Sequence, residues 1–172
     1  KAINAGYFKE QILPVVIQTG KKQEVFDTDE HLRKQVNLQD FSKLKPAFDR
    51  DGTVTAGNSS GINDGASALV LANKSAISKY SMPVMAKIIS YGVGGVAPNL
   101  MGLGPIPATR EALSSAGLNI SQIDCIESNE AFAAQACAVA SELDFDPAKT
   151  NPNGGAIALG HPVGASGAII LT

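Results

Sequence analysis

The chain has 172 residues, of which 44% are hydrophobic and 17% charged, a composition typical of a folded domain rather than a disordered segment. The formal net charge of −2 argues against a general nucleic-acid-binding protein, and no apolar run reaches the roughly 18 residues of a membrane-spanning helix. Cys125 and Cys137 make neither a C-x-x-C pair nor a disulfide framework, which favours a reducing compartment, and we expect the cytoplasm. Because the chain begins with Lys1 rather than Met, the presence of a leader peptide stays open.

The first part of the chain predicts one helix and then a polar excursion. Apolar side chains recur on one side of residues 2–13, and Pro14 ends the predicted helix. Residues 16–62 are charged and rich in turn formers, so we expect a loop domain there. The predicted helix has no capping residue before it, and the apolar run 168–172 has none after it. We therefore expect a fragment of a longer protein.

The remainder of the chain predicts alternating strands and helices. An apolar, strand-like run at 66–72 leads into a short helix at 74–80. Beyond it, the pattern predicts strands at 84–90, 123–127 and 156–159 and helices at 107–116 and 130–143. Such alternation predicts an α/β fold of packed layers.

Two loops carry polar groups where a predicted strand passes to a helix, namely residues 128–133 and 151–167. Ligands in α/β folds bind beyond the carboxyl ends of strands, and helix N-termini favour negative charge. Asn129 in the first loop and His161 in the second are therefore candidates for chemistry. The structural alternatives are a helix N-cap for Asn129 and a satisfied core histidine for His161.

Two other sites are suggested by single motifs. The segment GNSSG at 57–61 matches the G-x-S-x-G of serine hydrolases, and Ser59, Asp124 and His161 follow the hydrolase order. The context argues against a hydrolase, because a nucleophile elbow needs a strand before it and a helix after it, whereas a turn-forming N-D-G follows here. The glycines around His161 lack the G-x-G-x-x-G spacing of a dinucleotide site.

Four segments together resemble signature blocks of the thiolase family, and they occur in family order. They are TVTAGNSSGINDGA at 53–66, MGLGPIPA at 101–108, NEAFA at 129–133 and GGAIALGHPVGASG at 154–167. The details are most similar to the short-chain, biosynthetic acetyl-CoA acetyltransferases. The resemblance implies a layered α-β-α-β-α fold, of which this chain is a C-terminal fragment. It divides the chain into the end of a loop domain that contributes to coenzyme A binding (1–62), the last segment of the N-terminal half (63–83) and a truncated C-terminal half (84–172).

The resemblance implies an acyltransferase that condenses two acetyl-CoA into acetoacetyl-CoA and CoA, or catalyses the reverse thiolysis. In the family, a cysteine takes the acyl group, and a second acetyl-CoA then loses an α-proton and attacks it. The residue matching His161 activates that cysteine and donates to the enolate oxygen, together with a water held by the residue matching Asn129. A longer-chain 3-ketoacyl-CoA thiolase and a non-catalytic acyl-CoA-binding protein are the open alternatives.

The resemblance also implies contacts with coenzyme A, whose thioester is the substrate, so no further cofactor and no metal is expected. The residues implied are Ser60 near the pantetheine, Phe48 and Arg33 near the nucleotide, and Ala56, Met101, Ala131 and Phe132 along the acyl and pantetheine channel. The expected partners are an acyl-CoA and further copies of the same subunit in a dimer or tetramer. Neither nucleic acid nor a membrane is expected.

Neither cysteine of the chain matches a catalytic cysteine of the family. Cys125 falls in a predicted strand and Cys137 in the predicted Ala-rich helix, so we expect both to be buried, small apolar side chains. The chain alone is therefore expected to be inactive. Ile169 stands where the family usually has arginine, which calls a local ion pair into question but not the roles of Asn129 and His161.

Overall fold

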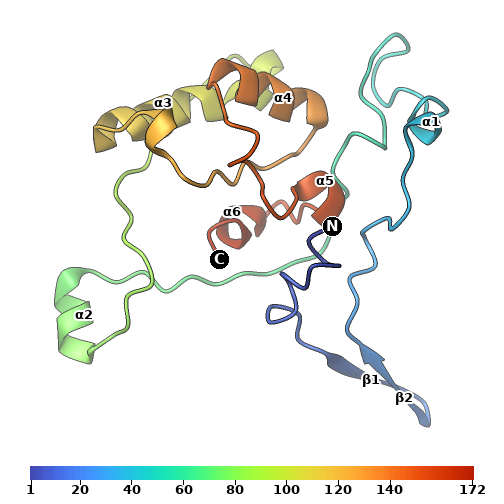
Figure 1. Cartoon of the computed structure of the whole chain (residues 1–172), viewed down its shortest axis with the longest axis horizontal. Coiled ribbons are helices and arrows are strands. Elements are labelled where there is room, and N and C mark those ends of the chain that lie inside the picture. Colours follow the sequence, from blue (N-terminus) through green and yellow to red (C-terminus); the bar gives the residue numbers. More distant parts are fainter.

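Helices make up most of the regular structure of the chain, which the computed structural model describes over residues 1–172. In chain order they are α1 (Leu38–Phe41), α2 (Lys74–Tyr80), the 3₁₀ helix η1 (Pro98–Leu103), α3 (Pro105–Ala116), the 3₁₀ helix η2 (Ile120–Gln122), α4 (Ala133–Glu142), α5 (Ala156–Leu159) and α6 (Ser166–Ile169). Figure 1 shows α3 and α4 together at one end of the molecule and α2 on an excursion away from them. None of the helices has the length and hydrophobicity to cross a bilayer.

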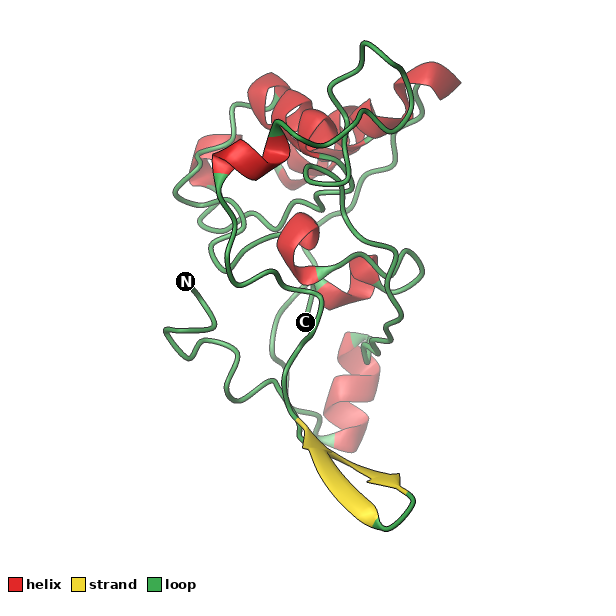
Figure 2. Ribbon diagram, turned by 90° about the vertical axis from the view of Figure 1, so that its right-hand side faces the viewer, coloured by secondary structure: helices red, strands yellow, loops and turns green.

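The one sheet of the chain is a hairpin that lies within the region predicted as loop. Strands β1 (Val15–Thr19) and β2 (Lys22–Phe26) pair antiparallel, with Val16 opposite Val25. β-Branched side chains favour the extended backbone, and Gly20 makes the turn in the left-handed conformation at φ +64°. The hairpin projects away from the helices (Figure 2), and all ten of its strand residues are exposed.

A cluster of buried apolar side chains lies where α4 packs on α3 and η1. It consists of Ile106, Val139 and Leu143, with Leu103 and Phe145 partly buried against it. Local signals delimit α3, because a proline stands in its first turn and Gly117 caps its end at φ +67°. The helix predicted at 107–116 is thereby confirmed, and it begins two residues earlier than predicted.

The helices predicted at 74–80 and 130–143 are also confirmed. Helix α2 matches the predicted 74–80, and the side chain of Asn73 caps it by accepting from the Ala76 N–H at 2.9 Å. Helix α4 begins three residues later than the predicted start at residue 130. The delay has a tertiary cause, because the Ala131 carbonyl accepts from Ser60 instead of from the helix.

Two segments differ from the structure predicted for them. Residues 156–159, predicted as a strand, form helix α5, which starts after Gly155 and ends at Gly160 with φ +99°. A run of four apolar residues is too short for its periodicity to separate strand from helix. In the segment 2–13, predicted as a helix, residues 2–11 form successive turns, and Gly6 interrupts them at φ +79°.

Three predicted strands are not part of the sheet, namely those at 66–72, 84–90 and 123–127. A strand needs a neighbouring strand to bond its N–H and C=O groups, and these segments contribute only the isolated bridge between Ile126 and Thr150. Most apolar side chains of 66–72 and 84–90 are exposed, as at Met85, which is 100% exposed, whereas Ile123 and Ile126 are half-buried. Only six of the 172 residues are buried, so most apolar side chains of this chain lie on its surface.

Both cysteines lie on the surface, which corrects the expectation that they are buried. Cys125 is not enclosed by a sheet, because the one pairing of the predicted strand around it is the isolated bridge between Ile126 and Thr150. Cys137 lies two residues before Val139, the most buried residue of α4. Two residues correspond to a rotation of about 200° around a helix, so Cys137 faces away from the buried side.

We therefore expect iodoacetamide to alkylate Cys125 and Cys137 in the native chain about as fast as in the chain unfolded by guanidinium, since access limits the reaction of a buried thiol. Intact-mass spectrometry over time would count the carbamidomethyl groups. Labelling that appears only after unfolding would contradict the exposed positions.

Candidate active site

Asn129 and His161, which are 32 positions apart in the sequence, are neighbours in the folded chain. The Nδ2 atom of Asn129 lies 3.4 Å from Nε2 of His161, and both residues are half-buried. Asn129 belongs to the loop that precedes α4, and His161 directly follows Gly160, which ends α5. Two polar side chains from separate loops thus share one environment.

The hydrogen bonds of His161 fit one tautomer of its ring. An amide nitrogen only donates, so the contact from Asn129 requires a lone pair on Nε2. Nδ1 then carries the proton and donates to Ser166 Oγ at 2.6 Å, and this hydroxyl donates to the Pro162 carbonyl at 3.1 Å. His161 therefore presents an unprotonated nitrogen, a proton acceptor, toward Asn129.

Ser166 is a site residue that sequence reasoning missed. It is 7% exposed and is the one buried polar residue of the chain, and its hydroxyl orients the imidazole of His161. A buried polar group needs a partner, and here the partner is the candidate catalytic side chain. A serine five residues after a histidine is a weak signal in a sequence, because only the turn into α6 brings the two side chains together.

Two further residues hold the Asn129 loop against the α5 loop. The side chain of Asn151 accepts from the Ser128 N–H at 2.7 Å and donates to the Ser128 carbonyl at 2.9 Å. The Glu130 carboxylate accepts from Asn151 Nδ2 and from the Ile157 N–H, both at 3.3 Å. Asn129 lies between Ser128 and Glu130, so both of its neighbours are fixed to the loop that leads to His161. Neither Glu130 nor Asn151 was singled out from the sequence.

Glycine at position 155 permits this contact. A Cβ at that position would overlap the Glu130 carboxylate, so only glycine lets the carboxylate approach the start of α5. Nearby, partial desolvation of its carboxyl group raises the pKa of Glu127 above its ordinary value. The segment from 127 to 130 thus combines one acid that is harder to ionise with one that bonds two donors.

Four of the residues predicted to contact coenzyme A lie together. Ser60 donates to the Ala131 carbonyl through its backbone N–H and through its hydroxyl, both at 3.0 Å. Phe132 forms a bridge with Ser59, and its ring meets that of Phe48 edge to face with 6.0 Å between centroids. The loop around Ser60 is therefore fastened to the start of α4, close in sequence to Asn129.

The structure does not connect the other three predicted contacts to this group. Ala56, Met101 and Arg33 are exposed, and no hydrogen bond or aromatic contact links them to Phe132. Arg33 takes part in neither ion pair of the chain, which join Lys43 to Asp40 and Arg110 to Glu142. Their proposed roles thus rest on the sequence resemblance alone.

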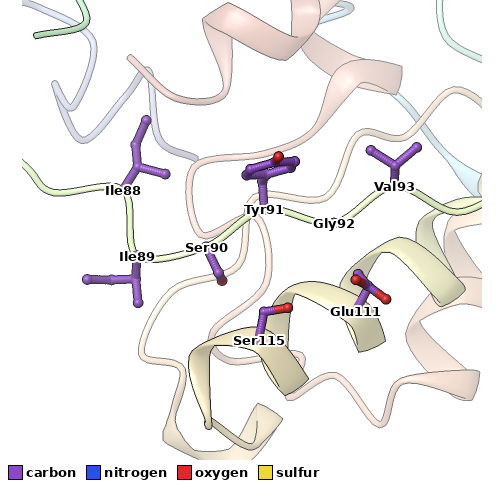
Figure 3. A pocket seen from close by; sticks show the side chains of 8 residues that line it. All are labelled: Ile88, Ile89, Ser90, Tyr91, Gly92, Val93, Glu111 and Ser115. Atoms are coloured by element: carbon purple, nitrogen blue, oxygen red, sulfur yellow. The ribbon is translucent and has the colours of Figure 1, made fainter. Parts of the chain in front are cut away.

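A cavity of about 620 Å³ is lined by a different set of residues (Figure 3). It lies between the unpaired segment Ile88–Val93 and α3, from which Glu111 and Ser115 contribute. It includes none of the residues proposed for catalysis or for coenzyme A. Cavity size therefore does not identify the site in this chain, whereas the contacts between polar side chains do. No three His, Cys, Asp or Glu residues of the chain lie close enough together to hold a metal ion.

Comparison with known families matches both halves of the chain. The family model described as "Thiolase, N-terminal domain" matches residues 1–75, and "Thiolase, C-terminal domain" matches residues 82–172. The chain belongs to the thiolase family.

Individual relatives cover the chain almost completely but extend well beyond it. Beta-ketothiolase BktB of Cupriavidus necator is 54% identical over 170 residues, which are 98% of this chain and 43% of that protein. The acetyl-CoA acetyltransferase of Escherichia coli is 55% identical over 170 residues, and the mitochondrial 3-ketoacyl-CoA thiolase of Homo sapiens is 49% identical over 171. Each of these covers 99% of this chain. The chain spans 43% of the length of each of the three.

Solved structures confirm the predicted thiolase-like fold. The crystal structure of the Bacillus anthracis acetyl-CoA acetyltransferase matches with a TM-score of 0.90 at 46% identity. That of human mitochondrial 3-ketoacyl-CoA thiolase matches with a TM-score of 0.86 at 45% identity. Both matches cover 99% of this chain and 43% of the solved chain.

Proposed function

We propose that this chain is part of an enzyme that condenses two acetyl-CoA into acetoacetyl-CoA and CoA and catalyses the reverse thiolysis. The observation that carries the proposal is the contact between Asn129 and His161, in which the Nε2 lone pair of His161 faces the amide. Family membership supports it, because relatives named acetyl-CoA acetyltransferase are 50% to 55% identical to this chain.

In the proposed reaction, His161 first acts as a base. Its Nε2 accepts the thiol proton of a cysteine, and the thiolate attacks the thioester carbonyl to form an acyl-enzyme. We place this cysteine outside residues 1–172, because neither Cys125 nor Cys137 has a hydrogen bond to His161 and both are exposed. The CoA thiolate leaves with a proton from a second acid/base group, which we also place outside residues 1–172, so Nε2 keeps the thiol proton.

In the second half of the reaction, the same two side chains act as donors. A second acetyl-CoA gives an α-proton to a base that we place outside residues 1–172, and negative charge develops on its thioester oxygen. Protonated Nε2 of His161 and a water held by Asn129 Nδ2 donate to that oxygen, and fixed donors of this kind are worth roughly 3–4 kcal/mol each. The α-carbon of this second acetyl-CoA attacks the carbonyl of the acyl-enzyme, and the cysteine thiolate leaves and takes back the proton from Nε2 as acetoacetyl-CoA forms. The bond to Ser166 keeps the imidazole in place while the charge forms.

The proposed coenzyme A surface is the group formed by Ser60, Ala131, Phe132 and Phe48. The rings of Phe48 and Phe132 form an apolar wall for the pantetheine arm, and their edge-to-face contact keeps the two rings in place. Two hydrogen bonds from Ser60 to the Ala131 carbonyl fasten this wall to the Asn129 loop. A thioester bound along the wall would therefore reach toward His161.

A longer-chain 3-ketoacyl-CoA thiolase is the second candidate. Relatives with that name are 49% and 50% identical to this chain, close to the values for the acetyltransferases. Chain-length preference depends on the room beyond the reacting carbonyl rather than on Asn129 or His161. The third candidate is an acyl-CoA-binding protein without turnover.

A thiolysis assay separates the three candidates. We expect the full-length protein that contains this chain to cleave acetoacetyl-CoA with a kcat/KM roughly tenfold or more above that for a longer 3-ketoacyl-CoA, since mismatched methylenes cost about 1–3 kcal/mol. Residues 1–172 alone should show no turnover, because they lack the nucleophile. A preference for the longer substrate would favour the second candidate. Binding of CoA without turnover would favour the third.

Other features of the whole protein stay predictions. We propose a homo-oligomer in the cytoplasm that uses the coenzyme A thioester as its substrate and needs no other cofactor. Size-exclusion chromatography with light scattering would measure the assembly.

A further inference from the structure

The side chain of Asn63 lies between the two histidines of the chain. Its Oδ1 accepts from the backbone N–H of His161 at 3.1 Å, and its Nδ2 lies 3.2 Å from Nδ1 of His31. These partners are 98 and 32 positions away in the sequence, and all three residues are half-buried. Neither Asn63 nor His31 has a role in the function proposed above.

The orientation of the Asn63 amide follows from its partners. The backbone N–H of His161 only donates, so it requires the amide oxygen. The amide nitrogen then faces His31 and donates, so Nδ1 of His31 is the acceptor and carries no proton. The backbone N–H of His31 donates to Asp29 Oδ1 at 3.1 Å. Asp29, His31, Asn63 and His161 thus form a row of hydrogen-bonded residues, of which Asp29 is the far end.

The backbone at His161 depends on such an external contact. Gly160 precedes it at φ +99°, where glycine has wide conformational freedom, so Gly160 does not by itself fix the backbone direction at His161, and the bond from Ser166 acts on the ring rather than on the backbone. A Cβ at residue 160 would stand 2.7 Å from Asn63 Oδ1, and one at residue 61 would overlap the His31 ring. Glycine at both positions thus admits the row, and the bridge between Ile62 and His161 lies beside it.

We propose that Asn63 is a positioning residue for the thiolase reaction, which holds the backbone of His161, and that His31 fixes the direction of its amide. The inference rests on the proposed role of His161. Asn63 touches no reacting atom in this scheme. It acts by keeping Nε2 aligned with Asn129 when the proton moves.

The test uses the full-length protein that contains this chain. Asn63→Ala should lower kcat for thiolysis roughly tenfold to a hundredfold with little change in the KM for CoA, because misplacement of a catalytic group by about 1 Å has effects of this size. His31→Ala should cause a smaller loss. His31→Asn should restore activity toward the wild-type value, since the asparagine oxygen can accept from Asn63 in place of Nδ1.

Asn73→Ala is the matched control. It removes the same side chain from the cap of α2, where it bonds Ala76, so it should lower the Tm and leave kcat unchanged. Equal kcat in Asn63→Ala and Asn73→Ala, or a His31→Asn variant no better than His31→Ala, would overturn the proposal.

Hydrogen exchange of the His161 amide separates this proposal from the proposed function. Loss of its acceptor should accelerate that exchange in Asn63→Ala and not in Asn73→Ala, whether or not the protein has thiolase activity. Accelerated exchange in a protein without turnover would show that Asn63 holds the His161 backbone and would refute the proposed function. Unchanged exchange would overturn the positioning role.

Discussion

His161→Ala is expected to lower kcat for thiolysis by roughly 10³–10⁴ in the full-length protein, because it removes both a base and a donor. The structure gives the physical basis. Nε2 carries a lone pair for the thiol proton, and the bond from Nδ1 to Ser166 stabilises the imidazole once it is charged. Alanine can do neither.

Steady-state thiolysis of acetoacetyl-CoA measures this loss, and circular dichroism of the same sample checks the fold. Val163→Ala is a control in the same loop, because that side chain is 77% exposed and should leave kcat unchanged. Activity of His161→Ala within tenfold of the wild type would show that another group is the base.

Asn129→Ala is expected to lower kcat by roughly 10²–10³, the effect of losing one donor to a developing negative charge. The loss should be smaller than that of His161→Ala, because Nε2 still accepts the thiol proton. Stability should change little, since the side chain of Asn129 has no hydrogen bond other than that to His161. Thiolysis and condensation rates, with the melting temperature as a stability check, measure the two effects separately.

Asn119→Ala is the matched control for this variant, since its side chain is exposed and bonds only Gln122. The double variant Asn129→Ala/His161→Ala extends the test. Its loss should be less than the product of the two single losses, as expected for groups that act as a unit. A double variant whose loss equals that product would mean that the two side chains act independently, despite the 3.4 Å between them.

Local sequence signals were sufficient for the elements that carry their own caps. The predicted helix 74–80 coincides with α2, which Asn73 caps, and Gly117 marks the end of α3, whose start was predicted two residues late. The motif blocks that contain Asn129 and His161 likewise identified the family, which the comparisons show. In each case the determining interaction lies within a few residues or in a continuous pattern.

Only the tertiary structure decided the features that depend on distant partners. The segment 156–159 became a helix where Glu130 binds its first turn, and the predicted strand at 84–90 is unpaired because no other segment bonds to its backbone. Cys125 is exposed because the segment around it is not part of a sheet. The side chain of Ser166 contacts the His161 ring across a turn, and that of Asn63 accepts from the His161 backbone N–H across 98 positions, contacts that no local pattern encodes. Helix caps involve residues that are close in sequence, so they can be predicted from the sequence. Strand pairing, burial and the orientation of a catalytic imidazole depend on contacts with distant parts of the chain.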